Sequence, residues 1–253
     1  MRTAIAGLVL AAVAAIAAPA HAEPTDITVR VLARDAKFIG TSMGGVRVTI
    51  SDAETGEVLA QGLTEGGTGD TGIIMNEPRT RGGALSTEGA ADFRATVDLD
   101  RPRRLKVTAE GPLEFPGSAN TVTATQWVVP GRHLAAGDGW VVEMPGLVVN
   151  VHDLPDSVRA GEPLDLRATV EMMCGCPLTP GGLWDADEFV VRAEAVRHKK
   201  TQASTDLGYA GEASEFSGTL VLDEPGTWYL RVWAWQERTG NTGVAERSIE
   251  VAE

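Results

Sequence analysis

The sequence is poor in the side chains from which most catalytic and metal sites are built. Its 253 residues include only two cysteines, Cys174 and Cys176, and four histidines. Beyond residue 22 the remaining histidines are His133, His152 and His198, and no two of them have metal-ligand spacing, so a zinc site made of histidines alone is not expected. The chain also lacks Gly-x-Ser-x-Gly and His-Glu-x-x-His motifs, which leaves hydrolase chemistry without support.

Long apolar runs are absent except near the N-terminus. Arg2 precedes an apolar run over residues 4–18, and Ala-His-Ala at residues 20–22 has the small-x-small pattern of a cleavage site. This pattern predicts a cleaved secretory signal peptide over residues 1–22, with an uncleaved N-terminal anchor as the alternative. No cysteine follows the cleavage site, so a lipoprotein is not expected. We expect a soluble periplasmic protein with no membrane span in the mature chain.

The chain carries a clear excess of acidic residues. Its formal net charge is −13, and removal of residues 1–22, which contain one basic and no acidic residue, gives −14. Such a charge repels phosphate backbones and anionic lipid surfaces. A nucleic-acid partner is therefore not expected, and plain solubility is the simplest reason for the charge.

Helical periodicity is nearly absent after residue 22. Apolar and polar residues instead alternate over short segments such as 45–52, 164–172 and 228–235, and the chain is rich in turn formers, with 29 glycines and 13 prolines. These features predict an all-β protein with two β-sandwich domains, residues 23–145 and 146–253. The glycine-rich segment 66–72 is expected to be a flexible loop inserted in the first domain, with an ordered, partner-contacting insertion as the alternative.

The first domain carries a recognisable hairpin pattern. An Asp-x-x-Thr-Gly turn at residues 52–56 joins two strand-like segments, and residues 87–93 feed a later segment that contains Phe93. Over residues 25–112 this pattern resembles prealbumin-like, Cna-B-like and carboxypeptidase-regulatory-like sandwiches. The resemblance implies a fold, and such modules serve many functions.

The second domain has a different signature. Residues 223–232 read Asp-Glu-Pro-Gly-Thr-Trp-Tyr-Leu-Arg-Val, which resembles the penultimate strand of immunoglobulin-like and fibronectin-like domains. About seven strands over residues 147–253 fit such a sandwich. A Cys…Trp…Cys pattern is missing, so an antibody-type domain is excluded.

The most informative cluster is Met172-Met173-Cys174-Gly175-Cys176. If the strand over residues 164–172 continues to Cys176, Met172, Cys174 and Cys176 share one face and Met173 points to the other. Soft sulfur ligands select Cu(I), so copper is the most plausible metal, with His152 or His198 available to add an imidazole.

Two other states of the cysteines remain open. The pair can form a disulfide across one residue, either as a structural staple or as a redox-active pair. It can also be buried without any bond. Thiol–disulfide exchange has less support, because no lysine or histidine lies beside the thiols to lower their pKa.

The loop after the cysteines is the second candidate site. Trp184 is placed to cover the sulfurs, and Asp185 and Asp187 could line a ligand site or contact a partner. These carboxylates lack the regular ligand series of an EF-hand, so an acidic turn is the favoured interpretation.

A tryptophan cluster lies on the strand over residues 228–235. Trp233 and Trp235 share one face and Trp228 points to the other. Core packing with one tryptophan at the rim is the favoured interpretation, and stacking on a sugar or a partner is the alternative. Taken together, the sequence predicts a binding or accessory protein, not an enzyme, that holds Cu(I). The alternatives are an interaction scaffold with a Cys174–Cys176 disulfide and a thiol–disulfide exchanger, and the expected partner is a protein or a metal ion.

Overall fold

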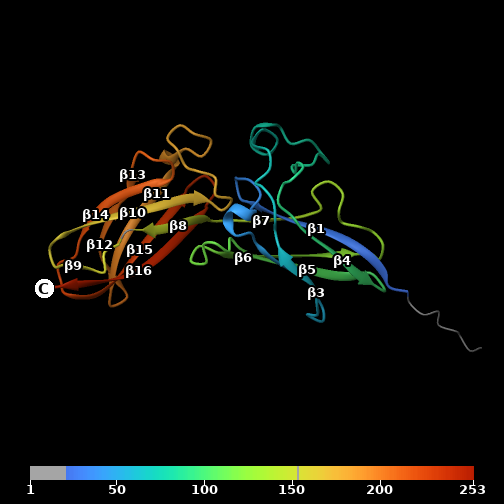
Figure 1. Ribbon diagram of the computed structural model, residues 1–253, viewed down its shortest axis with the longest axis horizontal. Helices are drawn as coiled ribbons and strands as arrows, with labels where there is room; N and C mark the ends of the chain where they lie inside the picture. The colour runs from blue at the N-terminus through green and yellow to red at the C-terminus, as the bar shows by residue number, and fades with distance from the viewer. Residues whose placement is uncertain (1–20, 153) are drawn as a thin grey trace, which may run out of the picture.

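The computed structural model describes residues 21–152 and 154–253. The predicted signal peptide thus lies outside the described residues, except for its last two. Figure 1 shows two β-rich lobes arranged end to end along the long axis, with β1 to β7 in one and β8 to β16 in the other. None of the described helices is long and apolar enough to cross a membrane.

The first lobe is a sandwich of two sheets with strand orders β4-β1-β7 and β3-β2-β5-β6. β1 runs antiparallel to β4 and parallel to β7. The strands are β1 (Glu23–Ala33), β2 (Arg47–Asp52), β3 (Val58–Leu63), β4 (Phe93–Leu99), β5 (Arg103–Gly111), β6 (Asn120–Val128) and β7 (Trp140–Met144).

The turn predicted between β2 and β3 forms as its residue types require. The Asp52 carboxylate accepts hydrogen bonds from the backbone N–H groups of Glu54 (2.8 Å) and Thr55 (2.9 Å). Gly56 follows with a φ of 78°, a conformation that glycine adopts without a steric penalty. The turn fixes the β2–β3 pairing, on which one face of the sandwich is built.

The second lobe is a larger sandwich with strand orders β13-β14-β10-β8 and β12-β11-β15-β16-β9. Its pairs are antiparallel apart from β9, which runs parallel to β16. The strands are β8 (Leu147–His152), β9 (Ser157–Arg159), β10 (Pro163–Met172), β11 (Phe189–Arg197), β12 (Lys200–Asp206), β13 (Gly208–Tyr209), β14 (Glu215–Val221), β15 (Gly226–Gln236) and β16 (Thr242–Ala252). The all-β sandwich class predicted from the sequence is confirmed.

Alternation along the strands builds both cores. On β10, Leu164, Leu166, Ala168, Val170 and Met172 are buried while the residues between them are exposed or half-buried. Successive side chains of a strand point to opposite faces, so buried apolar residues recur at every second position. One face of each sheet is therefore apolar and packs against the facing sheet.

The glycine-rich segment forms a loop over residues 66–70, and Gly67 connects it to a later turn by donating to the Gly89 carbonyl (2.8 Å) and accepting from the Ala91 N–H (2.8 Å). Residues 64–92 lie over the sheet that contains β1, and Ile74 and Ala91 pack with Phe38 in a small second core. The insertion includes a π-helical turn, Gly72–Asn76, and the other short helices are 3-10 turns at Thr41–Met43 and Ala186–Glu188. Gly40 and Gly66 allow close backbone approach here, since a Cβ on Gly66 would lie 2.7 Å from the Gly89 carbonyl oxygen.

Candidate functional site at the disulfide hairpin

The segment that contains the cysteines is a tight hairpin loop. β10 ends at Met172, the Gly175 N–H donates to the Met172 carbonyl (2.8 Å), and the Met172 N–H donates to the Cys176 carbonyl (3.1 Å). Gly175 has a φ of 73°, the left-handed conformation found at the last position of three-residue hairpin loops. The chain then turns back, and Pro177 forms a bridge with Glu171.

This hairpin brings the two cysteines together as a disulfide. Cys174 and Cys176 are bonded, with their Cα atoms 5.4 Å apart, inside the range usual for disulfides. The strand ends at Met172, as the segment 164–172 predicts, so the condition for a face shared by Met172, Cys174 and Cys176 is not met. The disulfide alternative is confirmed, and it arises from the turn, not from the shared face of an extended strand.

The sulfur groups are enclosed. Cys174 is 1% exposed and Cys176 5% exposed, and Met172 and Met173 are fully buried. Met173 lies against Gly146, where an added Cβ would come within 3.2 Å of its Sδ atom. The disulfide therefore belongs to the packed interior of the structure, away from bulk solvent.

The two histidines proposed as extra ligands do not lie with the sulfurs. His152 pairs with Arg167 on β10, five residues before Met172, which corresponds to a separation of about 17 Å along the strand. Its Nε2 lies 3.3 Å from Glu215 and 3.1 Å from Thr169 Oγ1. His198 is exposed in the turn after β11, at the end of that strand opposite to Phe189, about 26 Å away. The structure thus separates both imidazoles from the cysteines.

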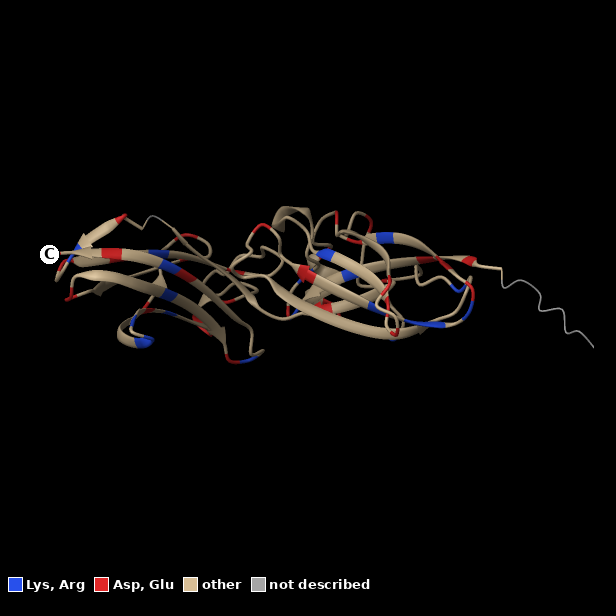
Figure 2. Ribbon diagram, turned by 90° about the horizontal axis from the view of Figure 1, so that it is seen from below, with Lys and Arg blue, Asp and Glu red and all other residues tan. Residues whose placement is uncertain are grey.

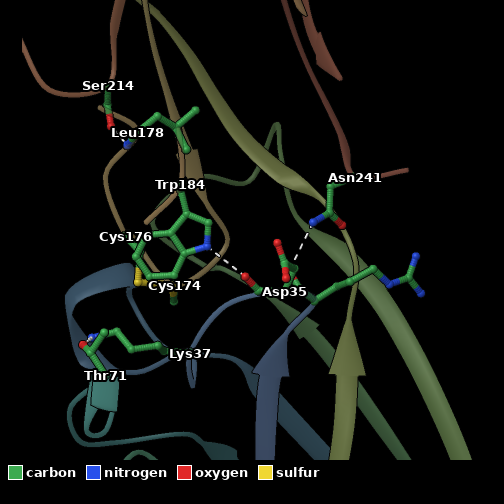
Figure 3. The surroundings of a disulfide bond; sticks show 10 residues. Asp35, Lys37, Thr71, Cys174, Cys176, Leu178, Trp184, Ser214 and Asn241 are labelled. Atoms are coloured by element: carbon green, nitrogen blue, oxygen red, sulfur yellow. Dashed lines mark hydrogen bonds between the residues drawn. A yellow bond between two sulfur atoms is a disulfide. The ribbon is translucent and has the colours of Figure 1, made fainter. Parts of the chain in front are cut away.

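Trp184 lies beside the disulfide and connects the two lobes. It is buried, and its Nε1–H donates to the carbonyl oxygen of Asp35 (2.8 Å), which belongs to the first lobe. Figure 3 shows the indole next to Cys174 and Cys176 with its nitrogen directed at Asp35. A buried indole N–H needs an acceptor, so this bond fixes the orientation of the ring across the contact.

The neighbouring carboxylates have separate roles. Asp185 accepts from the backbone N–H groups of Gly181 (2.9 Å) and Asp187 (3.1 Å), which caps the 3-10 turn Ala186–Glu188. This is the acidic turn favoured by the sequence. The Asp187 side chain stays exposed. No group of three or more potential metal-ligating His, Cys, Asp or Glu residues occurs in the part of the chain that the structure describes.

The sequence did not point to the residues that complete this contact. Asp35 adopts a φ of 56°, and its carboxylate forms an ion pair with Arg238 (2.7 Å). Asn241, which is fully buried, donates through Nδ2 to the Arg34 carbonyl (3.1 Å) and accepts through Oδ1 from the Gly146 N–H (3.0 Å). Arg34 and Asp35 thereby bind the second lobe at adjacent positions, and Figure 3 shows Asn241 and Trp184 approaching this turn from the second lobe.

The disulfide hairpin also packs directly on the first lobe. A Cβ on Gly175 would lie 2.5 Å from Met43 Sδ, so the absence of a side chain at Gly175 allows Met43 to approach. We call the set Met43, Asp35, Gly175, Trp184 and Asn241 the joint. The joint combines an apolar contact at the disulfide with polar bonds beside it.

The ion pair between Arg238 and Asp35, at the rim of the joint, adds little to its stability. The hydrogen bond from Arg238 to the Asp35 carboxylate raises the pKa of that guanidinium further above its usual range. The Arg238 side chain is 53% exposed, so the ion pair is screened by water and contributes at most about 1 kcal/mol. The buried bonds of Asn241 and Trp184 carry more of the stability, because breaking one leaves a desolvated partner.

Glu171, next to the hairpin, has a perturbed pKa. Burial raises the pKa of this carboxyl above its ordinary value of 4.5, and the Glu215 carboxylate adds to the effect. The ionised form of Glu171 is therefore less favourable in the folded protein than in water.

Comparison with known proteins does not assign the chain to a family. No protein-family profile matches it, and no curated protein matches it. Among solved structures, it overlaps the chicken interferon gamma receptor alpha chain at 12% identity and a TM-score of 0.33, over 91% of this chain and 98% of that one.

Two further structural matches have similar scores. Fibronectin(III)-like modules of Clostridium thermocellum CbhA match at 11% identity and a TM-score of 0.27, over 81% of this chain and 76% of that one. An engineered protein matches at 18% identity and a TM-score of 0.32, over 50% of this chain and 24% of that one, so the chain spans about a quarter of its length. Immunoglobulin-like and fibronectin-like modules are thus among its structural neighbours, and no specific family is identified.

Proposed function

We propose that this chain is an exported interaction scaffold whose two sandwich lobes are held in one relative orientation by the joint. The observation that carries the proposal is the position of the disulfide hairpin. Gly175 lies against Met43, and Trp184, beside the disulfide, donates across the contact to Asp35. A fixed orientation is useful to a binding protein, because two surfaces engage one partner together only when geometry permits.

The state of the cysteines favours a scaffold over an exchanger. Thiol–disulfide exchange requires a thiolate that can reach a disulfide sulfur, or a disulfide sulfur that an attacking thiolate can reach. Cys174 is 1% exposed and the pair is already bonded, so the folded, oxidised protein offers neither. The compartment predicted from residues 1–22 would maintain this bond.

The copper function predicted from the sequence stays a prediction for the reduced protein. Bonded sulfurs supply no thiolates, so the oxidised form does not fit a Cu(I) ion. The specific observation that keeps this second candidate is Met43, which adds a third sulfur beside Gly175. Titration of the reduced protein with Cu(I) tests it, and uptake that is unchanged when Cys174 and Cys176 are both replaced by serine would reject it.

Rotational motion tests the proposed scaffold. In ¹⁵N relaxation measurements on the oxidised mature protein, we expect one rotational correlation time for amides of both lobes. Trp184→Phe keeps an aromatic ring but removes the donor to Asp35, and should allow the lobes to reorient separately. Trp127→Phe, at a tryptophan that is 63% exposed in the first lobe, is the matched control. Independent tumbling in the wild-type protein would refute the proposal.

Partner engagement tests the other half of the proposal. Cells that export the protein express one variant with a photo-crosslinking residue at position 235 and another with this residue at position 127. The two variants sample the surfaces of the second and the first lobe. We expect a discrete adduct that weakens when Trp184→Phe is added. Lack of any discrete adduct from either lobe would show that the protein is not an interaction scaffold.

A further inference from the structure

The outer face of the sheet β12-β11-β15-β16-β9 carries a row of aromatic side chains. Along β15, Trp228 is buried in the core, whereas Tyr229 and Trp235 are exposed and Trp233 is half-buried on the opposite face. The sequence correctly placed Trp233 and Trp235 together. Val190 on β11 pairs with Trp235, and it is exposed too.

Arginines cover two of the three tryptophans of β15. The Arg197 guanidinium lies over the Trp228 ring at 5.4 Å, and the Arg192 guanidinium lies over the Trp233 ring at 5.6 Å. Trp233 Nε1–H also donates to Glu194 (3.0 Å), so this indole is held between a cation and a carboxylate. These contacts are cation–π interactions, which favour arginine over flat indole faces.

Trp235 is exposed beside an open hollow and is not covered by an arginine of the described residues. An open hollow of about 490 Å³ is lined by Trp235, Val190, Asp187, Glu188, Glu237 and Arg238. No arginine of the described residues lies over the Trp235 ring. Arg238 lines the hollow, but its guanidinium is directed to Asp35 (2.7 Å) and Glu188 (3.4 Å).

The charges of the hollow favour a cation from outside. Arg238 and Glu188 pair with each other, which leaves the Asp187 and Glu237 carboxylates without a side-chain hydrogen bond or ion pair among the described residues. In Figure 2 acidic and basic residues both occur along the strands of the two lobes. An exposed indole, an apolar wall and two free carboxylates suit a guanidinium carried on an apolar stem.

We infer that the Trp235 hollow binds an arginine side chain presented by an extended segment of a protein partner. The guanidinium stacks on the Trp235 indole and faces Asp187 and Glu237, as Arg192 stacks on Trp233 beside Glu194. This inference rests on the proposed scaffold function and names the chemistry of its partner. Since Arg238 connects the hollow to Asp35, the bound segment would lie at the edge of the joint.

A short peptide that contains one arginine between uncharged residues tests the inference. It is added to the oxidised, full-length mature protein. We expect a saturable shift of the Trp235 indole N–H resonance at millimolar peptide. Trp235→Leu, and separately the pair Asp187→Asn with Glu237→Gln, should weaken binding by roughly tenfold or more. Tyr229→Thr, at an exposed position farther along the same strand, is the matched control and should bind like wild type.

Peptides that differ at the arginine identify what is recognised. Replacement of arginine by citrulline keeps the shape and removes the charge, and it should abolish the shift. Replacement by lysine should weaken binding, because an ammonium lacks the planar face that stacks on indole. Equal binding of the citrulline or lysine peptide, or unchanged binding in Trp235→Leu, would overturn the inference. So would a shift caused by a neutral oligosaccharide in place of the arginine peptide.

The two proposals fail in different ways. If the arginine peptide does not bind while ¹⁵N relaxation still gives one correlation time for both lobes, the Trp235 inference is wrong and the scaffold proposal stands. If the lobes tumble independently while the peptide binds at Trp235, the scaffold proposal is wrong and the binding of arginine at Trp235 stands. Circular dichroism of each variant confirms that it is folded. Because the side chains of Trp235, Asp187, Glu237 and Tyr229 are exposed, folding should be preserved in the variants of the peptide test.

Discussion

Asn241 offers the sharpest test of how the joint is stabilised. It is fully buried, and its amide serves both lobes: Nδ2 donates to the Arg34 carbonyl (3.1 Å) and Oδ1 accepts from the Gly146 N–H (3.0 Å). Asn241→Ala removes both bonds and leaves two main-chain groups without partners. Each buried unsatisfied group costs about 1–3 kcal/mol, so the free energy of unfolding should fall by about 2–6 kcal/mol.

Urea unfolding followed by tryptophan fluorescence measures this loss. The amide of Gly146 gives a local readout, since its exchange with solvent should accelerate in Asn241→Ala even where the lobes stay folded. Asn150→Ala is the matched control, because the Asn150 amide accepts only a long 3.4 Å contact from Arg247 on the exposed surface. Its effect should stay within about 0.5 kcal/mol.

The result that would refute this reasoning is a small effect at Asn241. A loss within about 0.5 kcal/mol, together with unchanged protection of the Gly146 amide, would mean that the lobes are held by other contacts. The hydrogen bond of Trp184 to Asp35 and the apolar contact of Gly175 with Met43 would then be the contacts to test next.

Three further predictions concern single residues near the joint or the insertion. Arg30→Met removes the pairing of a buried guanidinium with Asp92 (2.9 Å) and its bonds to the Ala90 and Ala91 carbonyls, so stability should fall by about 3–5 kcal/mol and proteolysis within residues 64–92 should accelerate. Gly175→Ala places a Cβ at a φ of 73° and 2.5 Å from Met43 Sδ, so the urea midpoint should fall by the equivalent of about 1–2 kcal/mol. Glu171→Gln should raise the urea midpoint at neutral pH, because burial raises the folded-state pKa and the ionised carboxyl is disfavoured there. The gain should vanish below pH 4.5, where the acid is protonated in both the folded and unfolded chain.

Local patterning was enough to predict most strands of the fold. β10 and β15 alternate strictly between buried and exposed residues, so their limits could be read from the sequence. β12 escaped notice because Lys200–Asp206 is an exposed edge strand with almost no apolar residue to mark a face. The packing of residues 64–92 was missed for another reason: Ile74 meets Phe38 only after the chain has folded back over the sheet.

The candidate site was only partly predictable. The sequence allowed a disulfide between Cys174 and Cys176, but the turn that forms it was not predicted, although Gly175 is the residue type that a three-residue hairpin loop requires. The joint could not be found from the sequence. Asp35 and Arg238 are 203 residues apart, and no local pattern indicates that a surface turn in one sandwich will meet the end of a strand in another.

The small size of the disulfide ring indicates what this bond contributes. Its cysteines are separated by two positions, and for a ring of three residues the chain-entropy relation gives only about 1.6 kcal/mol of stabilisation, against about 3 kcal/mol for a 15-residue loop. The bond therefore restrains little of the unfolded chain. What it fixes is the shape of the turn that presents Gly175 to Met43 beside Trp184. The oxidation state of this pair should consequently change how the two lobes are joined before it changes whether either lobe is folded.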